Sequence, residues 1–521
     1  MLDSLKPIKQ YFVNNFRQLS VFLLIIAYFI FLFISLYKIQ IRDSEYYKDL
    51  GDRQYSGKSQ DLARGRIFFS DKDGSKGDLV ADTIEVEKED KSGNILKVEN
   101  RIYPYDSIGA KVVGFVAYNE NDRVGRYGIE KYYNDVLLRD NEKFWTNFFA
   151  EIFGNATGTL TSDDPVNEGD IVLTIDGEME KYLHEVLLDT QKKWKSDTIG
   201  GIIMSPKDGR VVAMEELPTF DLNNFNKVDD IKVYKNDLVS GVYEMGSIIK
   251  PLTVAAALDA GKINLSSTYY DSGMRVLNGR NIHNYDGRAR GTVNVQEILS
   301  QSLNVGIVHL VELLGGDGFS DYFKRYGLGS ETGIDLPSEA SGLTSNLDSK
   351  IFVDRATAGF GQGVALTPIQ TVRALATLGN GGKLVNPYIV DSIEFKDGSV
   401  KKITPDQGEE IFDNKDTSEN VTRMLVKVVD TALAKGAYKK DHYSIASKTG
   451  TAQMVAPNGK YYEDRYLHSI FAYYPAYDPE YIIFLYHTYP KGAEYASQTL
   501  TESLFKLIDF SISYYNIAPD R

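Results

Sequence analysis

An uncharged, apolar run near the N-terminus constrains this chain more than any other feature. The twenty residues from Gln18 to Tyr37 carry no charge and are mostly Leu, Ile, Phe and Val. A helix rises about 1.5 Å per residue, so this run would span roughly 30 Å, the thickness of a bilayer core. A signal peptide has a shorter apolar core and a small-residue cleavage site, and neither feature is present here. We predict an uncleaved transmembrane helix over 18–38, with a buried core helix as the alternative.

The charges that flank this run are nearly balanced. Three basic residues lie before it, and Lys38 and Arg42 follow it. Long domains cross a membrane largely regardless of such charges. We therefore expect a short cytoplasmic tail over 1–17 and a single-pass protein of the cell membrane, with its catalytic body extracytoplasmic.

The composition excludes several classes of function. Lys and Arg total 58 against 72 for Asp and Glu, a net charge of −14, and no basic run is present, so nucleic acid is not an expected partner. The absence of cysteine excludes disulfides, thiolate metal sites and cysteine catalysis. The six histidines lack the His-Glu-x-x-His spacing, and we predict neither a metal nor a cofactor.

A polar stretch over 154–168 separates two regions of different character. Gly, Asn, Ser, Asp and Pro gather in it, as is typical of linkers. Before it, over 39–165, short β-type segments and a hairpin at 83–100 predict a small, extended, β-rich pedestal. After it, over 166–521, strands at both ends enclose a mostly helical middle. This order predicts an α/β (α+β) fold with an antiparallel sheet flanked by helices.

Several elements of the second region can be placed from their patterns. Pro206-Lys207-Asp208-Gly209 joins two apolar strands into a hairpin, which makes the sheet antiparallel. A closing helix should pack on that sheet. The expected elements are strands at 171–176, 201–205, 211–214, 469–474 and 481–486, and helices near 177–194 and 497–515.

An aromatic stripe at helical spacing lies just before the linker. It comprises Phe144, Trp145, Phe148, Phe149, Ile152 and Phe153. Such stripes are more often core than docking sites. The alternative is a helix that lies on the membrane surface or against a partner.

A serine followed three residues later by a lysine carries the first chemical signal. On a helix, Ser247 and Lys250 share one face, so the amine can reach the hydroxyl, as a serine nucleophile with a lysine base requires. The same spacing recurs at 35–38, 399–402 and 503–506, but only Ser247 has Gly before it and a long apolar run after it. Taken alone, a capping serine is an equal alternative.

A glycine-rich run, Gly359-Phe360-Gly361-Gln362-Gly363, lies further along the chain. No strand precedes it and its spacing differs from that of a dinucleotide-binding loop. We predict a turn near the site.

Two more short motifs complete an ordered set. Ser302-Leu303-Asn304 is expected between helices and Lys448-Thr449-Gly450 on a strand. With these motifs the sequence resembles the class B (monofunctional) penicillin-binding proteins, which are peptidoglycan D,D-transpeptidases, from about Arg64 to His487. Other shared motifs are Arg64-Gly65-Arg66-Ile67, Gly128-Ile129-Glu130-Lys131, Gly333-Ile334-Asp335-Leu336-Pro337-Ser338-Glu339, Thr367-Pro368, Thr451-Ala452-Gln453 and Asp478-Pro479. Met245 and Ile248 depart from the family, which commonly has Pro and Thr there, and the segment between Gly74 and Arg101 is shorter than usual.

The resemblance implies a role for each motif residue. Ser247 would be the nucleophile, Lys250 the general base and Ser302 a proton relay, while Asn304 would hold the lysine and the substrate amide. Lys448 is implied as a further catalytic residue, and it would bind the substrate carboxylate with Thr449, Gly450 and Thr451. The fold implied is that of the penicillin-binding and serine β-lactamase-like transpeptidase domain.

The resemblance also implies substrates and partners. These are peptidoglycan stem peptides, β-lactams, the membrane, a membrane glycan polymerase and other division or elongation proteins. Glu244 and the Ser302–Gly306 run favour a division-type enzyme acting in septal synthesis over an elongation-type one. Two further functions are compatible with the same motifs: a β-lactamase or β-lactam sensor, and a non-catalytic division scaffold.

Overall fold

The computed structural model describes residues 64–89, 94–119, 122–138, 168–405, 408–456 and 458–521, with positions 28, 29 and 32. The chain forms two compact units, Met1–Leu62 and Ala63–Arg521, and the elements below belong to the second. Among the described residues, no helix is both long and apolar enough to cross a bilayer. The predicted anchor at 18–38 and the aromatic stripe at 144–153 lie outside these ranges, apart from the three isolated positions.

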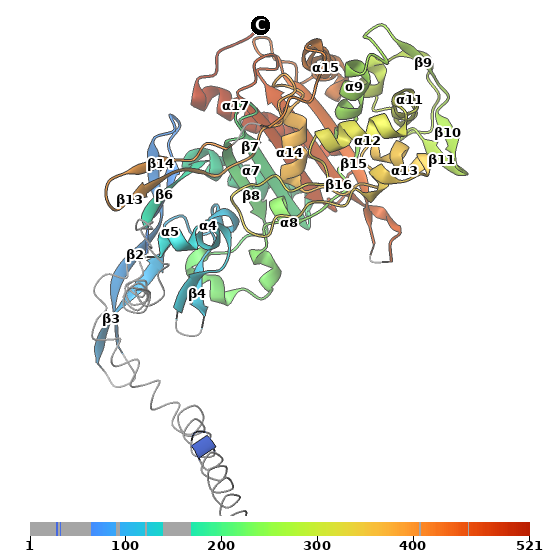
Figure 1. Ribbon diagram of the computed structural model, residues 1–521. Helices are drawn as coiled ribbons and strands as arrows, with labels where there is room; N and C mark the ends of the chain where they lie inside the picture. Colours follow the sequence, from blue (N-terminus) through green and yellow to red (C-terminus); the bar gives the residue numbers. More distant parts are fainter. Residues whose placement is uncertain are drawn as a thin grey trace, which may run out of the picture. The chain divides into compact units, whose positions relative to one another are not determined.

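A five-stranded antiparallel sheet forms the centre of the C-terminal region (Figure 1). Its strands, in spatial order, are β15 (Ala446–Val455), β16 (Tyr461–Tyr474), β17 (Tyr481–Thr488), β7 (Thr198–Met204) and β8 (Val211–Leu217). Every residue of β17 and β8 is buried, so both faces of the sheet are covered. The predicted hairpin is confirmed, with Ile203 opposite Ala213 in antiparallel register.

Helices pack on both faces because alternate residues of each strand face opposite sides. Ile483 of β17 joins a core with α7 (Gly177–Trp194) and α17 (Thr501–Tyr515). Phe484 joins the other core, which includes residues of α9, α11, α14 and α15. Those helices are α9 (Lys250–Asp259), α11 (Asn304–Leu314), α14 (Pro368–Ala376) and α15 (Asp416–Lys427). The predicted first and closing helices are confirmed, with the short α16 (Ala496–Thr499) before the latter.

A second, six-stranded sheet crosses the predicted domain boundary. Its order is β14-β13-β6-β1-β2-β3. The predicted hairpin at 83–100 is confirmed as β2 and β3. β1 pairs in parallel with β6, and Ile67 lies opposite Ile171. The sheet therefore contains residues from both sides of the predicted domain boundary at 165, and that boundary stays a prediction. The strands are β1 (Ile67–Ser70), β2 (Lys76–Glu89), β3 (Ile95–Ile102), β6 (Gly169–Asp176), β13 (Val390–Phe395) and β14 (Val400–Lys402).

The middle of the chain is less helical than predicted. Two short β-ribbons interrupt it, one of β9 (Thr268–Asp271) with β12 (Gly291–Asn294), the other of β10 (Met274–Leu277) with β11 (Arg280–His283). These strands have four residues each and several exposed side chains, so they carry little apolar periodicity that could have revealed them. The other elements are α3 (Ala110–Val113), β4 (Val116–Asn119), β5 (Asp122–Gly125), α4 (Gly128–Tyr132), α5 (Asn134–Leu137), α8 (Asp237–Ser240), α10 (Gln296–Ser300), α12 (Gly316–Arg325), α13 (Phe352–Ala358) and short 3₁₀ and π turns.

Candidate active site

Ser247 lies in a tight turn at the start of a buried helix. The 3₁₀ turn η5 (Gly246–Ile249) runs directly into α9. Gly246 has φ +64°, a left-handed conformation that favours glycine, and its N–H donates to the Gly361 carbonyl at 3.1 Å. A Cβ at Gly246 would lie 2.8 Å from the Thr451 carbonyl oxygen. The turn therefore packs closely between β15 and the glycine-rich run, which confirms the prediction that this run lies near the site.

Lys250 is fully buried and reaches the Ser302 segment. Its Nζ donates to the Ser302 carbonyl at 2.6 Å and to the Ser302 hydroxyl at 3.2 Å. Ser302 has φ +55°, a conformation that is uncommon for a residue other than glycine. Both oxygens of one residue thus contact the same amine.

Lys448 approaches the same hydroxyl from the sheet. It lies on β15, is 3% exposed, and its Nζ donates to the Ser302 hydroxyl at 3.1 Å and to the Thr449 carbonyl at 2.9 Å. The Ser302 hydroxyl oxygen therefore lies between two buried lysine amines that come from distant parts of the chain.

The surroundings of the two lysines lower the pKa values of both amines. Burial lowers the pKa of Lys250 well below its usual value, and the charge of Lys448 lowers it further. Burial lowers the pKa of Lys448 to about 7. Burial and the neighbouring charge both favour loss of the Lys250 proton, whereas burial alone lowers the pKa of Lys448.

The Lys-Thr-Gly segment lies beside the η5 turn that carries Ser247. A Cβ at Gly450 would lie 2.6 Å from the Met245 carbonyl oxygen and 2.5 Å from the Ser469 hydroxyl. That hydroxyl donates to the Met245 carbonyl at 2.9 Å, which ties β16 to the turn. Only a residue without a side chain fits between the two. Thr449 and Thr451 are partly exposed on the same strand.

Asn304 begins α11, two residues after Ser302. Its side-chain amide donates to the His283 carbonyl at 2.8 Å. Within the described ranges it makes no hydrogen bond to either lysine, so its predicted role of holding Lys250 stays a prediction.

One contact near Ser247, between Glu244 and Tyr461, was not predicted from the sequence. The Glu244 carboxylate accepts from the Tyr461 hydroxyl at 3.0 Å and from the Gly363 N–H at 2.8 Å. Burial raises the pKa of Glu244. The position of Glu244, three residues before Ser247, was visible in the sequence, but its partner lies on a distant strand. The contact links the residues just before η5 to the start of β16, near the tip of the β15–β16 hairpin.

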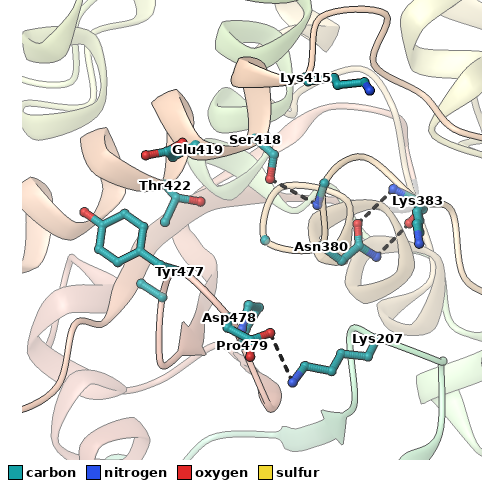
Figure 2. Close-up of a pocket in the computed structure, with 13 residues that line it drawn as sticks. Lys207, Asn380, Lys383, Lys415, Ser418, Glu419, Thr422, Tyr477, Asp478 and Pro479 are labelled. Atoms are coloured by element: carbon teal, nitrogen blue, oxygen red, sulfur yellow. Dashed lines mark hydrogen bonds and ion pairs between the residues drawn. The ribbon is translucent and has the colours of Figure 1, made fainter. Parts of the chain in front are cut away.

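A separate hollow of about 500 Å³ lies away from this constellation, between the start of α15, the loop after α14 and the turn after β16. Figure 2 shows Lys207 paired with Asp478 on one side. On another side the Ser418 hydroxyl accepts from the Gly381 N–H, in the loop after α14. None of the predicted site residues lines it. In the described part of the chain, no group of acidic or histidine side chains could hold a metal ion.

The transpeptidase-domain profile of the penicillin-binding proteins matches residues 199–508. The chain is 33% identical over 399 residues to stage V sporulation protein D of Bacillus subtilis, covering 75% of this chain and 60% of that relative. It is 26% identical over 426 residues to peptidoglycan D,D-transpeptidase FtsI of Escherichia coli, covering 81% and 68%. The chain thus spans about 60% of the length of the Bacillus relative.

A solved structure shares the fold. Penicillin-binding protein 3 of Mycobacterium tuberculosis, in complex with aztreonam, superposes with a TM-score of 0.73 and 23% identity, over 88% of this chain and 98% of that one. Profile, relatives and fold agree, and the chain belongs to the penicillin-binding protein transpeptidase family. Within that family it is a class B protein, which confirms the prediction made from its motifs.

Proposed function

We propose that this chain is a serine D-Ala-D-Ala transpeptidase that cross-links peptidoglycan stem peptides. The observation that carries the proposal is the Ser302 hydroxyl between Lys250 and Lys448, at 3.2 and 3.1 Å. A serine nucleophile needs a general base beside it, and two buried lysines around one hydroxyl favour a neutral amine that could serve as that base. The name of the Escherichia coli relative supports the substrate class.

Acylation follows from these contacts. Ser247 Oγ attacks the carbonyl carbon of the penultimate D-Ala while its proton passes to Lys250. The hydrogens of neutral Lys250 point to the carbonyl and hydroxyl of Ser302, so its lone pair is left for Ser247. The C–N bond then breaks, and the terminal D-Ala leaves as an amine that receives the proton by way of the Ser302 hydroxyl. The backbone N–H groups of Ser247 and Thr451 would hold the oxyanion, each contributing about 3–4 kcal/mol.

Deacylation completes the cross-link. The amine of a neighbouring stem peptide attacks the ester carbon and gives its proton to Lys250. The ester C–O bond breaks, the proton returns to Ser247 Oγ, and a new amide remains. Lys448, Thr449 and Thr451 would bind the substrate carboxylate, while Gly450 lets the strand approach the turn and Asn304 holds the substrate amide. A β-lactam would acylate the same serine.

The cellular setting is part of the proposal. The Gln18–Tyr37 run supports a single membrane anchor with the catalytic domain extracytoplasmic, beside a membrane glycan polymerase. Glu244 and the Ser302–Gly306 run support a role in division over one in elongation. A fluorescent fusion should gather at the division site, and patches along the lateral wall would favour the elongation role.

Labelling with fluorescent penicillin tests the chemistry. The full chain should form one covalent adduct, with the drug's mass on the peptide that carries Ser247, and Ser247→Ala should lose at least 99% of it, roughly the loss expected when a nucleophile is removed. Ser399→Ala is the matched control, because this serine also lies three residues before a lysine but in an exposed turn. Labelling that survives in Ser247→Ala would overturn the assignment. Fast turnover of a chromogenic β-lactam would instead indicate a β-lactamase, and a folded chain that takes no label would indicate a scaffold.

A further inference from the structure

A buried row of polar side chains lies beside Thr451, on residues that the proposed chemistry does not use. In the antiparallel register Thr451 of β15 lies opposite His468 of β16, and His468 opposite His487 of β17. Side chains directly opposite each other share one face of a sheet. Both histidines are fully buried, and Thr499 of α16, which covers them, is 2% exposed.

Four hydrogen bonds connect this row into a chain. His487 Nδ1 lies 2.7 Å from the Ser196 hydroxyl, and its Nε2 lies 2.9 Å from the Thr499 hydroxyl. The same hydroxyl lies 2.9 Å from His468 Nδ1, and His468 Nε2 lies 3.1 Å from the Glu494 carbonyl oxygen. This row of hydrogen bonds thus runs from the residues just before β7 to the segment just before α16.

One arrangement of hydrogens gives every ring nitrogen of the two neutral imidazoles a hydrogen-bond partner. A carbonyl can only accept, so His468 Nε2 carries a hydrogen and Nδ1 accepts from Thr499. The Thr499 hydroxyl also lies 3.3 Å from the Ala496 carbonyl oxygen, a longer contact than the 2.9 Å to His468 Nδ1. With the Thr499 hydrogen on His468, its oxygen accepts from His487 Nε2–H, and His487 Nδ1 accepts from Ser196. Burial lowers the pKa of His468 to about 4 and that of His487 well below its usual value, so both rings are neutral.

The end of this row of hydrogen bonds at Glu494 reaches the proposed substrate site. The Glu494–Thr499 segment, held by His468 at its first carbonyl and its last hydroxyl, presents the Ala496 N–H to the Thr451 hydroxyl oxygen at 3.1 Å. Within the described ranges the Thr451 hydroxyl has no acceptor for its own hydrogen. Because one lone pair is occupied by Ala496, that hydrogen points away from the segment and is available to a ligand.

We propose that His468 is a positioning residue for Thr451, which it orients as a donor to the substrate carboxylate through Thr499, Glu494 and the Ala496 N–H. This inference rests on the proposed function, because that function assigns the carboxylate to Thr451. His468 touches neither the substrate nor Ser247. It acts by fixing the segment that fixes the hydroxyl.

The tautomers can be measured on the unmodified full chain. Nitrogen-15 NMR of labelled histidine should show both buried rings with the hydrogen on Nε2 and a bare Nδ1. A hydrogen on Nδ1 of either ring, or a charged ring at neutral pH, would overturn the proposal whether or not the chain is a transpeptidase.

A pair of probes separates positioning from stability. Benzylpenicillin carries the carboxylate and its methyl ester does not, so the ratio of their acylation rates reports the carboxylate contact. We expect this ratio to fall about tenfold in His468→Leu and in Thr499→Val, the effect of losing a hydrogen bond to a charged group. His468→Gln should restore most of it, since its amide can donate to the Glu494 carbonyl.

Two further variants close the test. Ser196→Ala removes the hydrogen bond to His487 Nδ1, at the end of the row farthest from Thr451. It should lower the thermal midpoint and leave the ratio of acylation rates unchanged. In Thr451→Val the ratio should already be low, and adding His468→Leu should change it less than twofold, because residues that act through one contact are not additive. Equal losses with both probes, or an unchanged ratio in Thr499→Val, would overturn the proposal. If penicillin fails to acylate the wild type, the proposed function fails, and the NMR result still decides the hydrogen-bond chain.

Discussion

At the scale of single residues, the chemistry converges on one hydroxyl. Ser302 accepts from Lys250 and from Lys448, and its left-handed backbone also turns its carbonyl to Lys250. Two ammonium groups cannot both remain charged in so buried a place without a cost in free energy. This cost favours a state with one neutral and one charged amine, and the proposed mechanism uses a neutral Lys250 and a charged Lys448.

The pH profile of acylation should report this division. Acylation needs Lys250 neutral and Lys448 charged, so the rate of the free enzyme should rise from acid pH and then fall as Lys448 loses its proton near pH 7. Because the two lysines interact, the apparent pKa values belong to the pair. Stopped-flow acylation by penicillin between about pH 5 and about pH 10 would measure both limbs.

Lys448→Arg is the informative variant for that profile. A guanidinium keeps its charge to about pH 12, so the alkaline fall should disappear even if the maximal rate is lower. An alkaline limb that remains in Lys448→Arg would show that another group is responsible.

At the scale of elements, the site depends on how closely η5 approaches β15. Gly246 of η5 faces β15, and Gly450 of β15 faces the Met245 carbonyl just before η5. A side chain at either position would meet backbone or a buried hydroxyl. The glycine-rich run also contacts η5, because the Gly361 carbonyl accepts from the Gly246 N–H. The sequence showed these glycines, but only the packing explains why they lack side chains.

Gly450→Ala should therefore damage catalysis more than stability. The added methyl group pushes the Met245 carbonyl and the η5 turn away from β15. A displacement of a reacting group by about 1 Å can lower a rate about a hundredfold. The free energy of unfolding should fall by about 1–3 kcal/mol. Gly318→Ala in α12 is the control, since no atom lies within 4 Å of its added methyl group. If the Gly450 variant is acylated at the wild-type rate, the close contact does not position Ser247.

At the scale of the whole molecule, the two family motifs nearest the N-terminus meet in a buried ion cluster. Glu130 is fully buried, and its carboxylate accepts from Arg64 Nε at 2.5 Å and Arg101 Nε at 2.8 Å. Burial raises the pKa of Glu130, but the two guanidinium charges outweigh it and the pKa is lowered. The cluster joins α4 to β3 and to the residues just before β1. Because β1 pairs with β6, the cluster is connected to the six-stranded sheet that spans both predicted domains.

Glu130→Gln would leave two buried guanidinium groups without a counter-charge. We expect the free energy of unfolding to fall by about 3–5 kcal/mol, measured by urea denaturation. The acylation rate of the remaining folded protein should stay within about twofold, because the cluster makes no contact with Ser247 or the lysines. Glu85→Gln breaks the exposed pair with Lys97 and should leave the unfolding midpoint unchanged. A Glu130 variant as stable as the wild type would contradict this account.

Local patterns in the sequence were enough to predict the antiparallel strands, the flanking helices and the spacing of Ser247 and Lys250. These features depend on neighbours in the chain, where alternation or one helical turn decides which side chains share a face. The short exposed ribbons between 268 and 294 lack such a pattern and were missed.

The remaining features arise from residues that are far apart in sequence. The approach of Lys448 to Ser302, the bond between Glu244 and Tyr461, and the direction of Asn304 toward His283 depend on sheet register and packing. The sequence alone determined the family, its three motifs and their order. Only the tertiary structure decided which side chains touch, because a contact across the sheet is set by the burial of whole elements and leaves no local pattern in the chain.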